Sequence, residues 1–178
     1  MKVNVKKLAV SAMLVAVAVS LSGFSIPIGA SKCFPIQHLS NVIAGVFLGP
    51  WYGVAMAFCT SLIRNLMGTG SLLAFPGSMV GAYLCGAVYQ RFGKLTLAYA
   101  GEVFGTGIIG GILCYPVATL LMGKEAALFA YVMPFLMSTL CGTIMAAFLV
   151  GVLHKSGAFQ YLQHMLEGDA AMGRVIGK

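Results

Sequence analysis

Apolar residues occupy long runs of this chain, separated by short breaks that are rich in glycine, proline or charge. The breaks fall at residues 27–35, 49–51, 68–71, 90–94 and 123–125. They leave candidate membrane spans near residues 8–26, 37–49, 51–67, 75–90, 95–121 and 126–153, of which the second is short. Crossing a hydrocarbon core takes about 20 helical residues. The pattern therefore predicts an all-α integral membrane protein with six transmembrane helices.

Composition agrees with a location in the bilayer. The 178 residues are 60% hydrophobic and only 8% charged, and the net charge is +7. Mean hydropathy is +0.95. The basic residues are spread among short loops, which indicates orientation in a membrane rather than a nucleic-acid surface. The five cysteines are never close together in the sequence, so we expect small packing residues and no metal site or cofactor.

The distribution of Lys and Arg predicts how the helices are oriented. With six spans and the amino terminus inside, eight basic residues are cytoplasmic and three, Lys32, Arg64 and Lys124, are not. Merging the second and third spans into one kinked helix gives five against six. Because cytoplasmic loops are enriched in Lys and Arg, we expect six spans with both termini cytoplasmic.

The first span follows Lys2, Lys6 and Lys7. A basic start before an apolar run is also typical of a secretory signal, but the run is long and the remaining chain is equally apolar, so a retained helix is favoured. Ala12 and Ala16 form a stripe of small residues along it. Such a stripe serves either internal helix packing or the docking of another membrane protein.

We expect two regions in the chain. Residues 1–155 form the six-helix transmembrane substrate-binding domain, and residues 156–178 form a cytoplasmic tail. The tail contains Phe159, Tyr161 and Leu162 among polar residues, so it is either an amphipathic helix on the membrane surface or mostly disordered.

Polar and aromatic residues from several spans meet at the outer end of the predicted bundle. Polar side chains are costly inside a membrane and tend to face a cavity or one another. Their convergence predicts a site for a small, partly aromatic solute. The candidate binding residues are Gln37, His38, Asn41, Asn65, Ser78, Tyr83, Glu102, Tyr115 and Tyr131.

Several of these candidates have a second interpretation. Each aromatic residue can instead belong to the interfacial belt of a membrane protein. Glu102 is the only acidic residue well within a span and Arg64 the only basic one, which makes both functional candidates. Glu102 either contacts the solute or is a structural partner for neighbours such as Thr106. His38 either binds the solute or caps the short second helix.

Motifs for catalysis are missing from the sequence. Residues 105–110 fit the GxGxxG pattern, but they lie inside an apolar span instead of following a strand, so nucleotide binding is not expected. No GxxxxGK[ST] motif is present, and no pairing of a nucleophile with a base is visible. We therefore predict a protein that is not an enzyme and does not hydrolyse ATP itself.

The chain resembles the substrate-binding S components of energy-coupling factor (ECF) transporters, specifically the ThiW type, over about residues 6–155. The segments that carry the resemblance are Ala12-Met-Leu-Val-Ala16, Phe34-Pro-Ile-Gln-His38, Val42-Ile-Ala-Gly-Val-Phe-Leu-Gly-Pro50, Arg64-Asn-Leu-Met-Gly-Thr-Gly70, Ala74-Phe-Pro-Gly-Ser78 and Gly101-Glu-Val-Phe-Gly-Thr-Gly107.

The resemblance implies an ECF S-component-like bundle in the prokaryotic cytoplasmic membrane. Such a subunit captures the thiazole precursor of thiamine, hydroxyethylthiazole, at the outer face. It then docks through Ala12 and Ala16 on the transmembrane coupling protein EcfT, whose two ECF ATPases supply energy. The alternative is a stand-alone ion-coupled secondary transporter, in which Glu102 is the coupling acid. Neither function involves nucleic acid.

Overall fold

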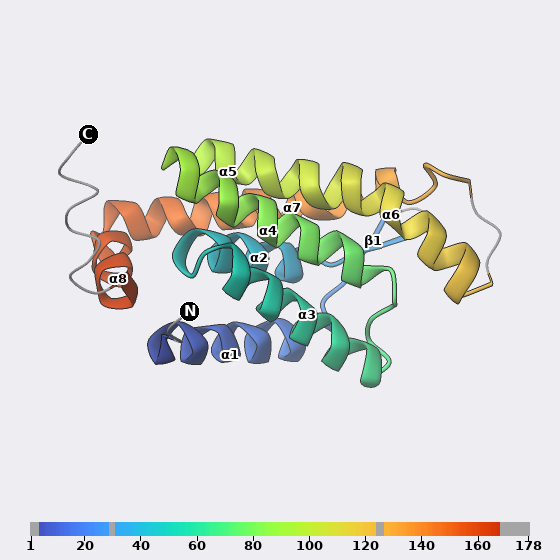
Figure 1. Ribbon diagram of the computed structural model, residues 1–178, viewed down its shortest axis with the longest axis horizontal. Coiled ribbons are helices and arrows are strands. Elements are labelled where there is room, and N and C mark those ends of the chain that lie inside the picture. Colours follow the sequence, from blue (N-terminus) through green and yellow to red (C-terminus); the bar gives the residue numbers. More distant parts are fainter. Residues whose placement is uncertain (1–3, 29–30, 124–126, 168–178) are drawn as a thin grey trace.

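A computed structural model describes residues 4–28, 31–123 and 127–167. Its helices form one bundle that is elongated along the helix axes (Figure 1). In chain order the elements are α1 (Val5–Ser20), β1 (Ile26–Ile28), β2 (Ser31–Cys33), α2 (Pro35–Phe47), α3 (Pro50–Leu66), α4 (Ala74–Phe92), α5 (Leu95–Glu102), η1 (Val103–Gly110), α6 (Gly111–Pro116), η2 (Val117–Leu121), α7 (Val132–Lys155) and α8 (Ala158–Glu167).

The helix boundaries coincide with the breaks expected from the sequence. Gly49, Gly68, Gly93 and Gly123 all have positive φ angles, between 60° and 94°, which glycine adopts at no steric cost. Pro50 follows Gly49 as the first residue of α3, a position where the missing N–H breaks no helical hydrogen bond. Residues 95–121 form one continuous helix in which the segments η1 and η2 are π-helical.

Two helices of the described residues, 95–121 and Val132–Lys155, are long and apolar enough to cross a membrane by themselves. Of the helices before residue 95, α1 has 16 residues, α2 has 13, α3 has 17 and α4 has 19. A 13-residue helix is about 20 Å long, which is less than the thickness of a hydrocarbon core. The six-span topology therefore stays a prediction.

The short helix α2 lies at the centre of the bundle. It packs against α1, α3, α4, α5, α7 and α8, and ten of its 13 residues are buried. Burial by other helices removes α2 from contact with lipid, so its length need not match the bilayer. Its first turns carry the polar residues Gln37, His38 and Asn41, whereas its last turns are apolar. The beginning of α2 thus brings polar side chains into the bundle, whereas its end lies in the apolar core.

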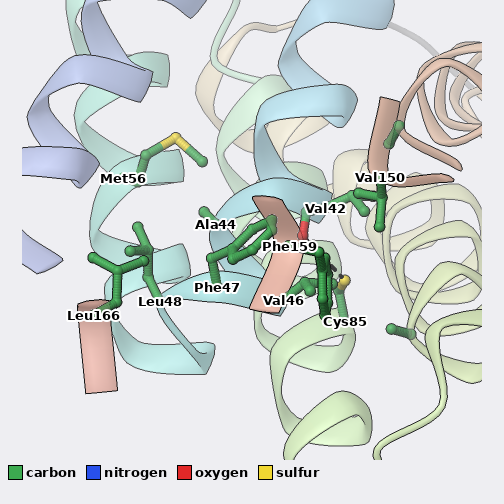
Figure 2. Close-up of a cluster of buried hydrophobic side chains, with 12 residues drawn as sticks. Val42, Ala44, Val46, Phe47, Leu48, Met56, Cys85, Val150, Phe159 and Leu166 are labelled. Carbon is green, nitrogen blue, oxygen red and sulfur yellow. Dashed lines mark hydrogen bonds between the residues drawn. The ribbon is translucent and has the colours of Figure 1, made fainter. Parts of the chain in front are cut away.

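The apolar core surrounds the carboxyl end of α2, as Figure 2 shows. Val42, Val46 and Phe47 of α2 pack there with Val150 of α7. Phe159 of α8 stacks on Phe47 with ring centroids 5.0 Å apart. Of the two possibilities for the tail, residues 158–167 therefore form a helix with one apolar face against the bundle. Residues 168–178 of the predicted tail lie outside the described residues.

Basic residues gather at the end of the bundle that α8 covers. The Lys6 ammonium donates to the carbonyl of Met165 at 3.3 Å, and Lys7 donates to the carbonyl of Leu48 at 3.2 Å. Arg91, Lys94 and Lys155 stand where α4 and α7 end and α5 begins. We call this the cationic end. The hairpin of β1 and β2 lies at the opposite end (Figure 1).

An antiparallel hairpin of β1 and β2 occupies much of the break at residues 27–35. Its register pairs Ile26 with Cys33 and Ile28 with Ser31. Cys33 is buried, and burial raises the pKa of its thiol. The thiol is therefore neutral at physiological pH. All five cysteines are free, and Cys33, Cys85 and Cys114 are buried among the helices.

Candidate solute-binding site

A cavity of 520 Å³ opens at the hairpin end of the bundle, opposite the cationic end. It is bounded by the beginnings of α2, α4 and α7, the end of α3, and the segments that follow α1 and α3. Its lining residues are Ser22, Gly23, Ser25, Phe34, Gln37, His38, Arg64, Gly68, Thr69, Gly70, Ser71, Leu73, Ala74, Ser78, Tyr131, Pro134, Phe135 and Ser138. None of these residues is acidic.

Gln37 is the centre of a hydrogen-bonded cluster in one wall of the cavity. Its side-chain nitrogen donates to the hydroxyls of Ser61 at 3.1 Å and Ser78 at 2.9 Å. Its side-chain oxygen accepts a hydrogen bond from Arg64. Three helices, α2, α3 and α4, are joined through this one amide. Because these hydrogen bonds occupy both ends of the amide, Gln37 holds the wall in place.

Arg64 supplies the only basic side chain in the wall apart from His38. Its exposed fraction is 3%. The guanidinium lies over the ring of Phe34, with Cζ 4.4 Å from the ring centroid, and Nη2 donates to the carbonyl of Thr69 at 3.2 Å. Its Nε has no hydrogen-bond partner, and in the described part of the chain no carboxylate lies within 4.0 Å of it. The cavity therefore has a pole that can only donate hydrogen bonds.

A second polar cluster lies behind His38. The carboxylate of Glu102 is fully buried, with an exposed fraction of 0%. Its Oε1 is 3.2 Å from Nδ1 of His38, 3.1 Å from Nδ2 of Asn41 and 3.0 Å from Oγ1 of Thr106. Its Oε2 has no hydrogen-bond partner. The Glu102 side chain does not reach the cavity surface, and its link to the cavity runs through the imidazole of His38.

The sequence-predicted candidates separate into three groups. Gln37, His38, Ser78 and Tyr131 line the cavity. Asn41 and Glu102 form the shell behind it, where Glu102 also contacts Thr106, the neighbour named in one of the two interpretations of this residue. Outside the cavity wall lie Asn65, Tyr83 and Tyr115.

The three outlying residues have other contacts or surroundings. Asn65 donates to the carbonyl of Ser61 within α3. Tyr83 is 39% exposed and meets Trp51 edge to face at 5.5 Å on the outside of the bundle. Tyr115 is half-buried, and its carbonyl accepts a hydrogen bond from Thr119. The ring of Tyr83 thus belongs to the outside of the bundle and not to the cavity.

Sequence reasoning left several lining residues out of the binding set. Arg64 was a functional candidate that was not assigned to the solute, and Phe34, Phe135 and Ser138 were not among the candidates. Ser138 accepts a hydrogen bond from the backbone N–H of Phe34 at 2.9 Å, which fixes the entry into α2 against α7. The signal available in the sequence was the isolated charge of Arg64 in an apolar span.

This arrangement suits reversible binding of a small molecule. The cavity combines aromatic and apolar walls with a few fixed polar groups, as small-molecule sites do. Across the described residues, no three His, Cys, Asp or Glu side chains are grouped as metal ligands would be. Within the described residues, the one pair of a basic and an acidic side chain within 4.0 Å is His38 with Glu102.

An apolar helix bundle with a polar cavity at one end defines a protein that carries or captures a solute at a membrane. The chain belongs to the ThiW family of thiamine-precursor transporter proteins, whose family model matches residues 8–156. The family resemblance expected from the sequence is thereby confirmed, and with it a role in transport and a membrane location. No curated protein and no solved structure matches the chain.

Proposed function

We propose that this protein is the substrate-binding S component of an ECF importer and that it captures 5-(2-hydroxyethyl)-4-methylthiazole, the thiazole precursor of thiamine. Membership of the thiamine-precursor transporter family supports a solute that is a precursor of thiamine. The cavity volume of 520 Å³ lies within the range of about 300–1,000 Å³ typical of small-molecule sites. Phe34, Tyr131 and Phe135 offer ring faces and edges to a heterocycle.

The orientation of the bundle supports capture from outside the cell. Lys6, Lys7, Arg91, Lys94 and Lys155 all lie at the cationic end. Positive residues flanking membrane helices favour the cytoplasmic side. The cavity opens at the opposite end, and so faces outward. In this orientation the amino terminus and the described part of the tail are cytoplasmic.

The first helix supports docking on a transmembrane coupling protein, EcfT, which works with two ECF ATPases. Ala12 and Ala16 are exposed on α1, together with Ala9 and Ser20. The bundle of this chain therefore does not cover the small-residue stripe. Small residues on an uncovered helix face let the backbone of a second helix approach closely. Energy conversion then belongs to the partner proteins.

The observation that carries the proposal is a cavity with polar and aromatic walls in a chain of the thiamine-precursor transporter family. Isothermal calorimetry on the purified protein, with the thiazole, the pyrimidine precursor and thiamine as separate titrants, tests it. We expect the thiazole to bind most tightly. Tighter binding of thiamine or of the pyrimidine overturns the assignment of the solute.

The burial of Glu102 favours one rival function, a stand-alone carrier driven by an ion gradient. A buried acid whose Oε2 lacks a partner is a candidate for carrying a proton. Uptake into proteoliposomes that contain this chain alone separates the two functions. Uptake that requires an imposed ion gradient but no ATPase supports the rival. Uptake only with the coupling protein, the ATPases and ATP supports the S component.

A further inference from the structure

The imidazole of His38 connects the buried carboxylate of Glu102 to the cavity. Its Nδ1 is 3.2 Å from Glu102 Oε1, and the ring is part of the cavity wall. Among the described residues, no side chain or backbone group forms a hydrogen bond with its Nε2. The outer nitrogen of the ring is thus open to a solute.

The surroundings of Glu102 determine which nitrogen of His38 carries the proton. Oε1 faces the Asn41 amide nitrogen at 3.1 Å, and an amide N–H can only donate. Oε1 is therefore an acceptor, and the His38 Nδ1–H donates to the same atom. A carboxylate that accepts from one ring nitrogen fixes the tautomer of the ring. In the neutral imidazole, Nε2 then presents a lone pair to the cavity.

The Arg64 side of the cavity has the opposite character. Arg64 donates to Gln37 and Thr69 and has no acceptor atoms. The side-chain oxygen of Gln37 is already used as an acceptor by Arg64. The cavity is consequently polarised, with donors at Arg64 and an acceptor at His38. A solute with a hydroxyl group matches the acceptor pole, because a hydroxyl is able to donate.

We propose that His38 is a specificity-determining residue whose Nε2 accepts a hydrogen bond from the hydroxyl of the solute, with Glu102 acting as the positioning residue that holds the tautomer. This inference rests on the proposed function, since it concerns the hydroxyethyl group of the thiazole. It assigns the recognition of that group to one atom. It also explains why a buried acid lies behind the cavity and not within it.

The test compares 5-(2-hydroxyethyl)-4-methylthiazole with its deoxy analogue, 5-ethyl-4-methylthiazole, by calorimetry. A single neutral hydrogen bond contributes enough to binding for a loss of about tenfold in Kd. We expect the wild-type protein to bind the alcohol about tenfold or more tightly than the deoxy analogue. Equal affinities for the two compounds overturn the inference and leave the proposed function intact. Binding of neither compound overturns both.

Variants of His38 test whether this residue distinguishes the alcohol from its deoxy analogue. In His38→Asn the amide is able to replace the Nδ1–H contact but leaves no atom at the position of Nε2, so the ratio of the two Kd values is expected to fall to about one. His38→Gln places a polar atom near the position of Nε2 and is expected to restore part of the ratio. His164→Asn makes the same substitution at an exposed histidine of α8, at the cationic end, and as the control it is expected to leave the ratio unchanged. A ratio kept in His38→Asn, or lost equally in His164→Asn, overturns the assignment.

A spectroscopic measurement on the wild-type protein does not depend on whether the variants fold. The chain has three histidines, so ¹⁵N-labelled histidine gives few signals, and substitution of the exposed His154 and His164 identifies the signal of His38 by elimination. We expect the free protein to carry the proton on Nδ1, and Glu102→Gln to weaken this preference and to reduce the Kd ratio. A proton on Nε2 in the free wild-type protein overturns the inference.

Discussion

Arg64 of α3 and Gln37 of α2 are joined by a hydrogen bond from the guanidinium to the amide oxygen. The amide nitrogen of Gln37 in turn donates to Ser61 and Ser78. Arg64 thus fixes the orientation of an amide that joins three helices. An arginine in this position both offers donors to a solute and holds the cavity wall together, because its fork of N–H groups reaches two acceptors in fixed directions.

The first prediction concerns the shape of this guanidinium. Arg64→Lys retains the positive charge but cannot donate to Gln37 and Thr69 together from one rigid plane. We expect the affinity for the thiazole to fall by about tenfold or more, since lost or unpaired buried hydrogen bonds cost about 1–3 kcal/mol. Calorimetry on the purified variant measures the loss.

Arg91→Lys is the matched control for this substitution. Arg91 is exposed at the cationic end, far from the cavity, and its replacement is expected to leave the affinity unchanged. If Arg64→Lys binds the thiazole as tightly as the wild-type protein, the guanidinium is not part of the binding site. An equal loss in both variants indicates a general effect of replacing arginine by lysine on the protein, not a local effect at the cavity.

The second prediction concerns the contact between α4 and the helix that carries Glu102. A Cβ atom at Gly81 would lie 2.7 Å from Glu102 Oε2 and would also overlap Thr106 Oγ1. Overpacking of this kind costs about 1–3 kcal/mol. Gly81→Ala is therefore expected to lower the thermal unfolding midpoint in detergent. It is also expected to weaken solute binding, because Glu102 holds His38.

Gly151→Ala provides the comparison for Gly81→Ala. Gly151 is also within a helix, α7, but a Cβ atom added there would meet no other atom within 4 Å. Alanine is favoured over glycine in a helix interior by about 0.5–1 kcal/mol, so the midpoint is expected to stay the same or rise. A stable Gly81→Ala protein with normal binding contradicts the tight packing of the Glu102 shell.

The third prediction concerns docking through α1. Ala12→Leu and Ala16→Leu are expected to abolish uptake in cells and co-purification with the coupling protein, while binding of the thiazole to the isolated subunit stays within about twofold. The reason is that both alanines are exposed and lie outside the cavity wall. Ala100→Leu, another exposed alanine on α5, is expected to be neutral. Loss of solute binding in the Ala12 or Ala16 variant assigns these residues to internal packing.

Local structure could largely be predicted from the sequence, because the helix breaks depend on local chemistry. Gly49 next to Pro50, and Gly93 after the basic end of α4, are residues whose backbone preferences end a helix wherever they occur. Gln37, His38 and Asn41 were placed together because all three stand at the outer end of the second predicted span. The predicted order of the spans placed all three at the outer end of the bundle, because the second span begins there.

The positions of the other site residues depend on tertiary packing, which no local sequence pattern encodes. Tyr83 lies in the same helix as Ser78, yet its ring turns outward to Trp51. Phe34 and Arg64 are far apart in the sequence and meet only because α2 and α3 pack side by side. The hairpin carries no strong local signal, because its residues have the composition of a break between spans. Its backbone pairing joins residues 26–28 to residues 31–33.

The last prediction tests the direction in which the cavity faces. Gly23 lies in the cavity wall and is exposed, with open space around it, and Lys94 is exposed at the cationic end. In a background with the five native cysteines replaced, a membrane-impermeant maleimide applied to intact cells is expected to label Gly23→Cys but not Lys94→Cys. Permeabilised cells are expected to label both. Saturating thiazole is expected to slow labelling at position 23 only, because the solute fills the adjacent cavity. Labelling of Lys94→Cys in intact cells would place the cationic end outside and the cavity on the cytoplasmic side. That result would contradict capture of the solute from outside the cell.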